Sequence, residues 1–176
     1  MCYRQEMQGR RLLPNFNPAS FVLGGLVALL VVWVGLSFRL ARVADDAMAP
    51  TYVNGDVLLV SALTYRDARP KRGDVAQLYY PLEPAKLLID RVVGIEGDTV
   101  QIFDGDLYIN DAPATEDNRI PATYRSRENW GPLVTPQGYY FVIGDHRNAS
   151  SDSRHWGFVP RRYLWGKVVA RLFPRR

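Results

Sequence analysis

Three aspartates stand where carboxylates could do acid-base chemistry. Asp45 and Asp46 are neighbours that follow an apolar run, and Asp90 comes directly after the apolar residues LLI. Two carboxylates held close together share a proton, and such a pair activates water in aspartic proteases. Either Asp45 or Asp46 could therefore pair with Asp90, and Asp46 with Asp90 is the candidate acid pair. The alternative is that Asp45 and Asp46 are solvated, since nothing in the spacing requires these side chains to converge.

A second polar segment, GDHRNASSDSRHWGFVP over 144–160, contains both histidines of the chain, His146 and His155. Histidine can act as a general base, but a histidine in a loop more often makes a local hydrogen bond or is exposed. Two histidines with scattered aspartates do not form a recognisable metal site. We therefore expect no metal and no cofactor.

Short Gly-Asp turns separate the apolar runs at 54–56, 72–74 and 96–98. Taken alone, each is turn chemistry, because glycine supplies unusual dihedrals and aspartate caps the turn with its side chain. Taken in order, they belong to a longer series of motifs: AMAPT (47–51), NGDVLLV (54–60), RGDV (72–75), DRVVGIEGDTV (90–100), LYIN (107–110) and the segment 144–160. This series resembles the bacterial type I signal peptidases, membrane-bound enzymes that remove signal peptides from exported proteins. The resemblance runs from about residue 19 to the end of the chain.

The resemblance implies a Ser-Lys dyad that this chain lacks. In the family, a serine immediately before the methionine of the first motif is the nucleophile. A lysine immediately before Arg-Val-Val-Gly, kept neutral by burial, takes its proton. Here these two positions are Ala47 and Asp90. We therefore expect the fold of the family without its Ser-Lys peptidase activity.

The resemblance also implies residues that shape the site. In the family, the serine at the position of Ser150 hydrogen-bonds the lysine amine, and the residues at Asp152 and Arg154 form an ion pair that holds the loop. Ser150 is expected here to donate its hydroxyl proton to Asp90 instead. The complete set of expected scaffold residues is Met48, Pro50, Thr51, Arg91, Gly144, Asp145, Arg147, Ser150, Asp152, Ser153 and Arg154.

The oxyanion hole implied by the resemblance uses the backbone N–H at position 47 and a nearby hydroxyl. Ala47 keeps that N–H. Asp45, two residues upstream, stands where many relatives carry a small or hydroxyl residue. A carboxylate there would repel a developing oxyanion, which is a further point against ordinary peptidase activity.

Few residues are placed to replace the missing dyad. Thr51 matches the family's own threonine, and Ser61 lies beyond an apolar strand. Lys86 precedes Asp90 by four residues, which is about 13 Å along a strand. His146 could replace the base but leaves no nucleophile. An active enzyme would therefore need another mechanism, such as the aspartate pair.

An uncharged apolar run over 19–38 lies between arginines on both sides. At about 1.5 Å per residue, its length as a helix matches a bilayer core of about 30 Å. A cleavable signal peptide would have an apolar region of about 7–15 residues followed by small residues, whereas arginine follows this run at once. We expect a retained transmembrane helix, whose orientation the flanking charge does not fix.

The rest of the chain predicts an all-β domain of short strands and turns. The expected strands are 57–63, 75–80, 87–95, 99–103, 107–111 and 138–144, with a hairpin at 104–106. Residues 112–135 are polar and proline-containing, and they predict a surface excursion or a weakly ordered β insertion. With the resemblance, the expected fold is mostly β: a signal-peptidase-like antiparallel domain of coiled sheets, or a partial barrel, with one N-terminal transmembrane helix.

The expected organisation is a tail over 1–18, the transmembrane helix over 19–38, and the β domain over 43–176 with a variable insertion near 112–135. The single cysteine, Cys2, excludes an intrachain disulfide. The net charge of +4 is scattered and accompanies no nucleic-acid recognition motif, so no nucleic-acid partner is expected. Three tryptophans, Trp130, Trp156 and Trp165, fit either the membrane interface or the core.

Two functions remain open. The first is an inactive signal peptidase homologue that binds signal peptides or exported, pilin-like proteins by strand addition, with an active signal peptidase as a candidate partner. The second is a signal peptidase that cleaves preproteins through atypical residues. In both cases the resemblance places the chain in the cell membrane, as a single-pass protein with its β domain on the extracytoplasmic side.

Overall fold

The computed structural model describes residues 18–115 and 119–174. The chain divides into two compact units, Met1–Val34 and Gly35–Arg176, and each is described by itself. The expectations for the N-terminal tail, including Cys2, fall almost entirely on residues 1–17 and lie outside the described residues.

Helix α1 (Pro18–Ser37) covers nearly the same residues as the apolar run 19–38. Its large apolar side chains are exposed from Phe21 to Leu36. Across the described residues, however, no helix combines the length and the hydropathy that crossing a membrane requires.

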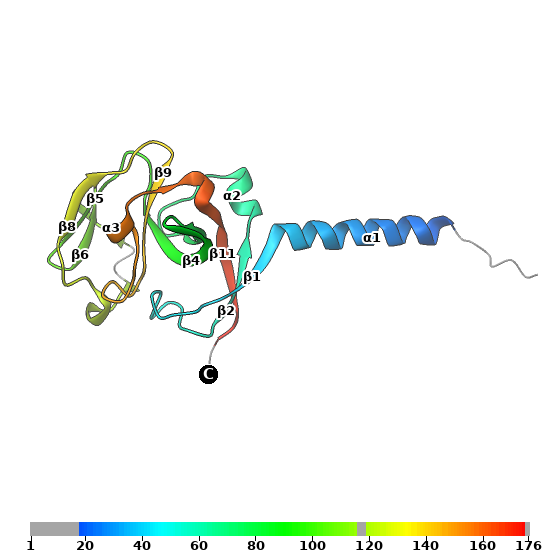
Figure 1. The fold of residues 1–176 in the computed structure, drawn as a ribbon, viewed down its shortest axis with the longest axis horizontal. Helices are drawn as coiled ribbons and strands as arrows, with labels where there is room; N and C mark the ends of the chain where they lie inside the picture. Colours follow the sequence, from blue (N-terminus) through cyan, green and yellow to red (C-terminus); the bar gives the residue numbers. More distant parts are fainter. Residues whose placement is uncertain (1–17, 116–118, 175–176) are drawn as a thin grey trace, which may run out of the picture. The chain divides into compact units, whose positions relative to one another are not determined.

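The second unit is mostly β and its strand pairs are antiparallel, as predicted. A seven-stranded sheet has the order β1-β2-β11-β3-β4-β9-β10, and a four-stranded sheet has the order β7-β6-β5-β8. Figure 1 shows β5, β6 and β8 at one end of this unit and β11, β2 and β1 at the other. The strands of the larger sheet are β1 (Phe38–Arg42), β2 (Val57–Ser61), β3 (Val75–Tyr80), β4 (Glu83–Gly94), β9 (Tyr139–Ile143), β10 (Val159–Pro160) and β11 (Leu164–Phe173). Those of the smaller sheet are β5 (Thr99–Phe103), β6 (Asp106–Ile109), β7 (Ala112–Pro113) and β8 (Trp130–Val134).

The sequence missed some elements of this unit. The run 57–63 is a strand only to Ser61, and a short helix α2 (Leu63–Asp67) follows it. A second short helix, α3 (Ser153–Trp156), lies in the polar segment. Short helices also interrupt the chain at η2 (Ala122–Tyr124) and η3 (Arg161–Tyr163). The expectation of a purely β domain was therefore too simple.

Strand β11 is the most important strand that the sequence did not predict. It lies between β2 and β3, near the middle of the larger sheet. Its pairing with β2 shifts register between Val168 and Ala170 and again between Arg171 and Phe173. Such irregularities break the alternation of apolar and polar residues that marks a strand in a sequence.

The segment 112–135 is partly ordered into the smaller sheet. Its strand β8 pairs with β5, with Thr99 opposite Val134, and most of β8 is exposed. The two ends of this segment are therefore β strands, and its description as a variable insertion stays a prediction.

Alternating residues of two central strands enter two different cores. Val92 of β4 and Val142 of β9 belong to a cluster with β3, whereas Val93 and Phe141 belong to a cluster with β5 and β6. This division follows from the two-residue period of a strand. The three tryptophans Trp130, Trp156 and Trp165 each pack against one of the hydrophobic clusters, so their role in the described structure is core packing.

Strand β4 extends well beyond β9. It pairs with β3 from Glu83 to Arg91, but with β9 only from Arg91 to Gly94. Among the described strands, residues 83–90 are therefore paired along one edge only. Asp90 lies at the point where the pairing with β9 begins.

Candidate functional site

The connection from β1 to β2, over 43–56, meets the loop that follows β9. The His146 N–H donates to the Ala47 carbonyl at 2.9 Å. A Cβ added at Gly144 would lie 2.6 Å from the Ala47 oxygen and 2.3 Å from Ser150 Oγ. Only glycine allows this approach, so the structure brings Ala47, Gly144 and Ser150 together. Met48, next to Ala47, is buried in the core.

A buried ion pair holds these segments against β4. Arg91 Nε donates to Asp145 Oδ1 at 2.8 Å, and Arg91 Nη2 donates to Oδ2 at 2.6 Å. The side chains are 7% and 0% exposed. Thr51 Oγ1 donates to Asp145 Oδ2, and Arg91 Nη1 donates to the Gly73 carbonyl. Four parts of the chain therefore converge on one carboxylate and its guanidinium.

A second ion pair shapes the loop after β9. Arg154 donates from Nε and Nη2 to the two oxygens of Asp152, each at 2.8 Å, as the resemblance implied. Asp152 Oδ2 also accepts the Gly144 N–H at 3.1 Å. Arg154 Nη2 donates to the Arg147 carbonyl at 2.6 Å, and Ser153 Oγ accepts the Val142 N–H at 3.0 Å.

The scaffold residues predicted from the sequence are thus held in one region by these bonds. Arg147 is buried, and its Nε donates to the Gly144 carbonyl at 3.2 Å. Pro50 is exposed and follows a cis peptide bond. Their arrangement does not depend on a serine at 47 or a lysine at 90.

Asp90 is buried at the inner side of this site. Burial raises the pKa of the Asp90 carboxyl well above its usual range. The negative charges of Asp152, Asp45 and Asp145 raise this pKa further, while Arg154 lowers it. The carboxyl is therefore favoured in its neutral, protonated form.

The predicted hydrogen bond from Ser150 to Asp90 is not formed. Ser150 Oγ and Asp90 Oδ2 are both buried, and within the described residues neither has a hydrogen-bond partner. Ser150 lies against Gly144. The loop thus keeps the position of this serine but not a contact between its hydroxyl and the new carboxyl.

The two neighbouring aspartates point to different partners. Asp46 Oδ1 accepts the Asn54 N–H at 2.9 Å, and Asp46 is not among the residues that line the cavity beside Asp90. Asp45 Oδ1 accepts the Ala47 N–H at 3.1 Å, and Asp45 borders the same cavity as Asp90. A carboxylate therefore holds the backbone donor that the resemblance assigns to the oxyanion hole.

The hydrogen bond from the Ala47 N–H to Asp45 could have been predicted from the sequence. An aspartate side chain commonly accepts the N–H two residues later, as in an Asx turn. The spacing from Asp45 to Ala47 fits that pattern, whereas the expectation considered only repulsion of an oxyanion.

A cavity of about 200 Å³ opens between the connection 42–48 and strand β4. Its lining residues are Arg42, Val43, Ala44, Asp45, Ala47, Met48, Lys86, Leu87, Leu88, Ile89, Asp90, Ala149 and Ser151. One wall is thus the edge of β4 that β9 leaves unpaired. Apolar side chains form much of the lining, and two carboxyl groups border it.

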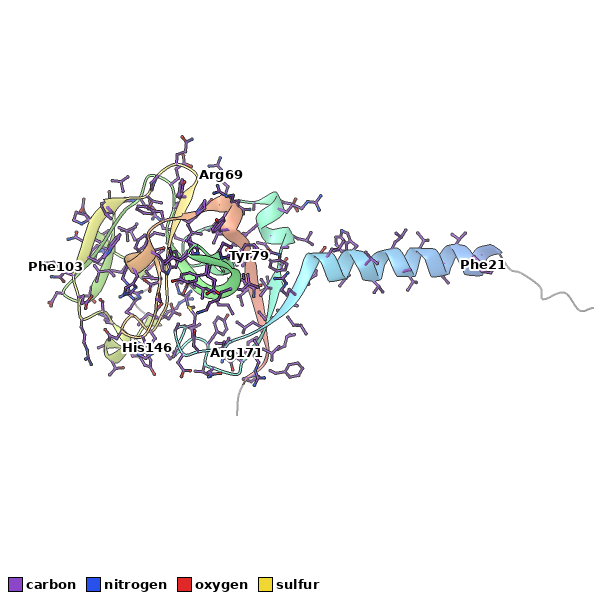
Figure 2. All side chains as sticks on the ribbon, viewed as in Figure 1. Phe21, Arg69, Tyr79, Phe103, His146 and Arg171 are labelled. Carbon is purple, nitrogen blue, oxygen red and sulfur yellow. The ribbon has the colours of Figure 1, made fainter. Side chains whose placement is uncertain are left out.

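Of the other candidates for catalysis, namely Lys86, Thr51, Ser61 and the two histidines, Lys86 alone lines the cavity. Lys86 Nζ lies 5.7 Å from the centre of the Tyr80 ring, Thr51 bonds Asp145, and Ser61 is buried in β2. His146, labelled in Figure 2, packs edge-on against Tyr124 and does not line the cavity. His155 Nδ1 accepts the Asp152 N–H. The described residues contain no cluster of three or more metal-ligating side chains.

Comparison with known proteins gives a consistent result. A sequence model of the family described as signal peptidase, peptidase S26, matches residues 18–173. The chain is 35% identical over 161 residues to signal peptidase I of Leptolyngbya laminosa, covering 85% of this chain and 76% of that protein. It is 30% identical over 185 residues to signal peptidase I of Bacillus caldolyticus, covering 99% and 96%.

A solved structure shares the fold. The crystal structure of a signal peptidase I from Enterococcus faecalis V583 aligns with a TM-score of 0.50 at 29% identity. The alignment covers 58% of this chain and 98% of that chain. The antiparallel β unit is therefore a signal-peptidase-like fold.

The buried ion pair predicts a large loss of stability on Asp145→Asn. The amide keeps the shape of the carboxyl group but leaves Arg91 as a buried charge without its counterion. We expect a loss of about 3–5 kcal/mol, measured by urea unfolding of the full-length protein in detergent with tryptophan fluorescence. The control is Asp106→Asn, because Asp106 and Arg125 form a pair whose side chains are 42% and 33% exposed, and such a solvated pair is worth about 0–1 kcal/mol. Equal losses in the two variants would contradict a structural role for Asp145.

The raised pKa of Asp90 predicts a pH-dependent effect of Asp90→Asn. At pH values above 3.8, the ordinary pKa of the carboxyl, the folded state still holds the proton of Asp90, whereas the unfolded state releases it. The stability that this proton contributes is therefore fully present below pH 3.8 and is lost as the pH rises through the pKa of the folded state. Asparagine does not titrate, so the gain in Tm of the variant over the natural chain should grow from acidic to neutral pH.

Thermal unfolding at a series of pH values measures this difference, with Asp46→Asn as the exposed control. A gain that is constant with pH, or as large in the control, would refute a buried neutral acid at position 90.

Proposed function

The chain belongs to the signal peptidase family, peptidase S26, and we propose that it binds exported polypeptides there without Ser-Lys cleavage. The observation that carries this proposal is the state of its reaction centre. Ala47 has no hydroxyl, its N–H is held by the Asp45 carboxylate, and Asp90 is a buried acid.

Each of these changes removes a part of the dyad chemistry. Without a hydroxyl at 47, no acyl-enzyme can form there. A protonated carboxyl at 90 has no free amine lone pair to accept a serine proton. The Ala47 N–H, already bonded to a carboxylate, is not free to stabilise a negative oxygen, and Asp45 would repel one.

The intact parts of the site support binding. The Arg91–Asp145 and Asp152–Arg154 pairs hold the connection 43–56 and the loop after β9 in place. Between them and β4 lies the cavity of about 200 Å³. The unpaired edge of β4 offers backbone groups to an extended peptide, which is the way peptides add to exposed sheet edges.

The ligands we propose are the extended ends of signal peptides, or of exported and pilin-like proteins, and an active signal peptidase is a candidate partner. Helix α1 supports a place at the membrane, since its large apolar side chains are exposed over its length and such surfaces favour lipid. We propose a single-pass anchor over 19–38, with the β domain of 43–176 on the extracytoplasmic side.

A second candidate function is an acid-dependent peptidase. Asp45 and Asp90 border one cavity, and two carboxyl groups held close together can share a proton. A water molecule between them could then attack a peptide bond. Two facts favour binding over this alternative: Asp45 Oδ1 is engaged by the Ala47 N–H, and Asp45 is exposed to solvent.

The test is cleavage of a signal-peptide-bearing preprotein by the purified full-length protein in detergent, from acidic to alkaline pH. The natural chain is compared with Ala47→Ser/Asp90→Lys and with the same double variant carrying Asp45→Ala. We expect no cleavage by the natural chain, since loss of a nucleophile costs about 10⁶ in rate. We expect cleavage by the double variant, and faster cleavage by the triple variant, because Asp45 no longer occupies the Ala47 N–H.

Binding of the same preprotein is measured in parallel by its retention on the immobilised natural chain. Retention without cleavage supports a binding protein. Cleavage by the natural chain at low pH that Asp90→Asn abolishes would sink this proposal in favour of the acid-dependent peptidase. Neither retention nor cleavage by any variant would show that the groove does not accept exported polypeptides.

A further inference from the structure

The carboxyl group of Asp90 lacks a partner in the described structure. Asp90 is only 3% exposed, it borders the cavity, and its Oδ2 has no hydrogen bond within the described residues. Buried polar atoms are nearly always hydrogen-bonded, because an unpaired one is costly. The isolated Oδ2 is therefore a group for which residues 18–115 and 119–174 supply no donor.

The carboxylates around Asp90 differ in whether they are already neutralised. Asp145 is paired with Arg91 and Asp152 with Arg154. Asp45 accepts only a backbone N–H in the described structure and borders the same cavity. The cavity therefore has two carboxyl groups without a cationic partner, Asp90 buried and Asp45 exposed.

The cations that border the cavity do not fill this role. Lys86 is exposed, and its ammonium lies over the Tyr80 ring. Arg42 is also exposed, at the end of β1. Within the described residues, neither Lys86 nor Arg42 forms an ion pair with Asp90 or Asp45.

We propose that this cavity binds the ammonium group of a lysine side chain in an extended peptide, between the carboxyl groups of Asp90 and Asp45. This inference rests on the proposed function, because the peptide lies along the unpaired edge of β4. On binding, Asp90 releases its proton to solvent and accepts a charge-assisted hydrogen bond at Oδ2. The ligand thus supplies a cation that the described part of the chain does not place there.

The lining of the cavity fits a lysine better than other side chains. Val43, Met48 and Leu88 border the cavity and can pack against the four methylene groups of a lysine stem, with the charge beyond them. An ammonium is a compact charge with three donors in free directions, whereas a guanidinium needs a planar, two-pronged acceptor. Asp90 and Asp45 come from different segments, so they suit the ammonium.

The experiment measures binding of blocked, fluorescently labelled alanine-based peptides to the full-length protein in detergent. The peptides carry lysine, norleucine or arginine at one central position, and norleucine keeps the apolar stem without the charge. We expect the lysine peptide to bind the natural chain at least about tenfold more tightly than the norleucine peptide. Asp90→Asn should remove most of this preference and Asp45→Asn part of it, whereas Asp46→Asn, outside the cavity, should retain it.

Several results would overturn the inference. Equal affinity for the lysine and norleucine peptides, or a lysine preference unchanged in Asp90→Asn, would show that the carboxyl does not bind the charge. Equal affinity for lysine and arginine would refute the choice of an ammonium. Binding of all peptides without preference leaves the proposed function standing, whereas binding of none removes both. Thermal unfolding confirms that each asparagine variant is folded.

Discussion

The architecture of the site depends on one buried ion pair, Arg91 with Asp145. Burying two charges is costly unless their geometry and remaining hydrogen bonds are good. Here both guanidinium contacts are short, Thr51 donates to the same carboxylate, and the Gly73 carbonyl accepts from Arg91. This one interaction therefore fixes β4, the loop after β9 and the connection between β1 and β2, and none of its members is a residue of the missing dyad.

The residues that hold the site together are thus different from those at positions 47 and 90. The side chains at these two positions can therefore differ while the site keeps its shape. At position 90 the buried group is a carboxyl, and burial favours its neutral acid form. Gly144 lies close to both the Ala47 carbonyl and Ser150. The framework around Asp90 is therefore held by contacts in which Asp90 itself takes no part.

The sequence predicted most strands of the β unit, because their apolar runs alternate and end at Gly-Asp turns. It missed β11, whose irregular pairing hides the alternation. The scaffold residues stand in recognisable motifs, and their roles in the site stay a prediction. Spacing along the chain could not distinguish Asp45 from Asp46 as a neighbour of Asp90. In the structure Asp45 borders the cavity together with Asp90, whereas Asp46 accepts the N–H of Asn54, eight residues along the chain.

The extra length of β4 also bears on how the protein stays apart from other copies of itself. A strand edge without a neighbour can pair with the same edge of a second molecule and begin aggregation. The outer part of β4 is protected from such pairing, because Glu83, Pro84 and Lys86 are exposed there. Two of them carry charges, and proline has no backbone N–H to donate to a second strand. Only the inner part, up to Asp90, remains open to pairing, and residues 42–45 face it across the cavity.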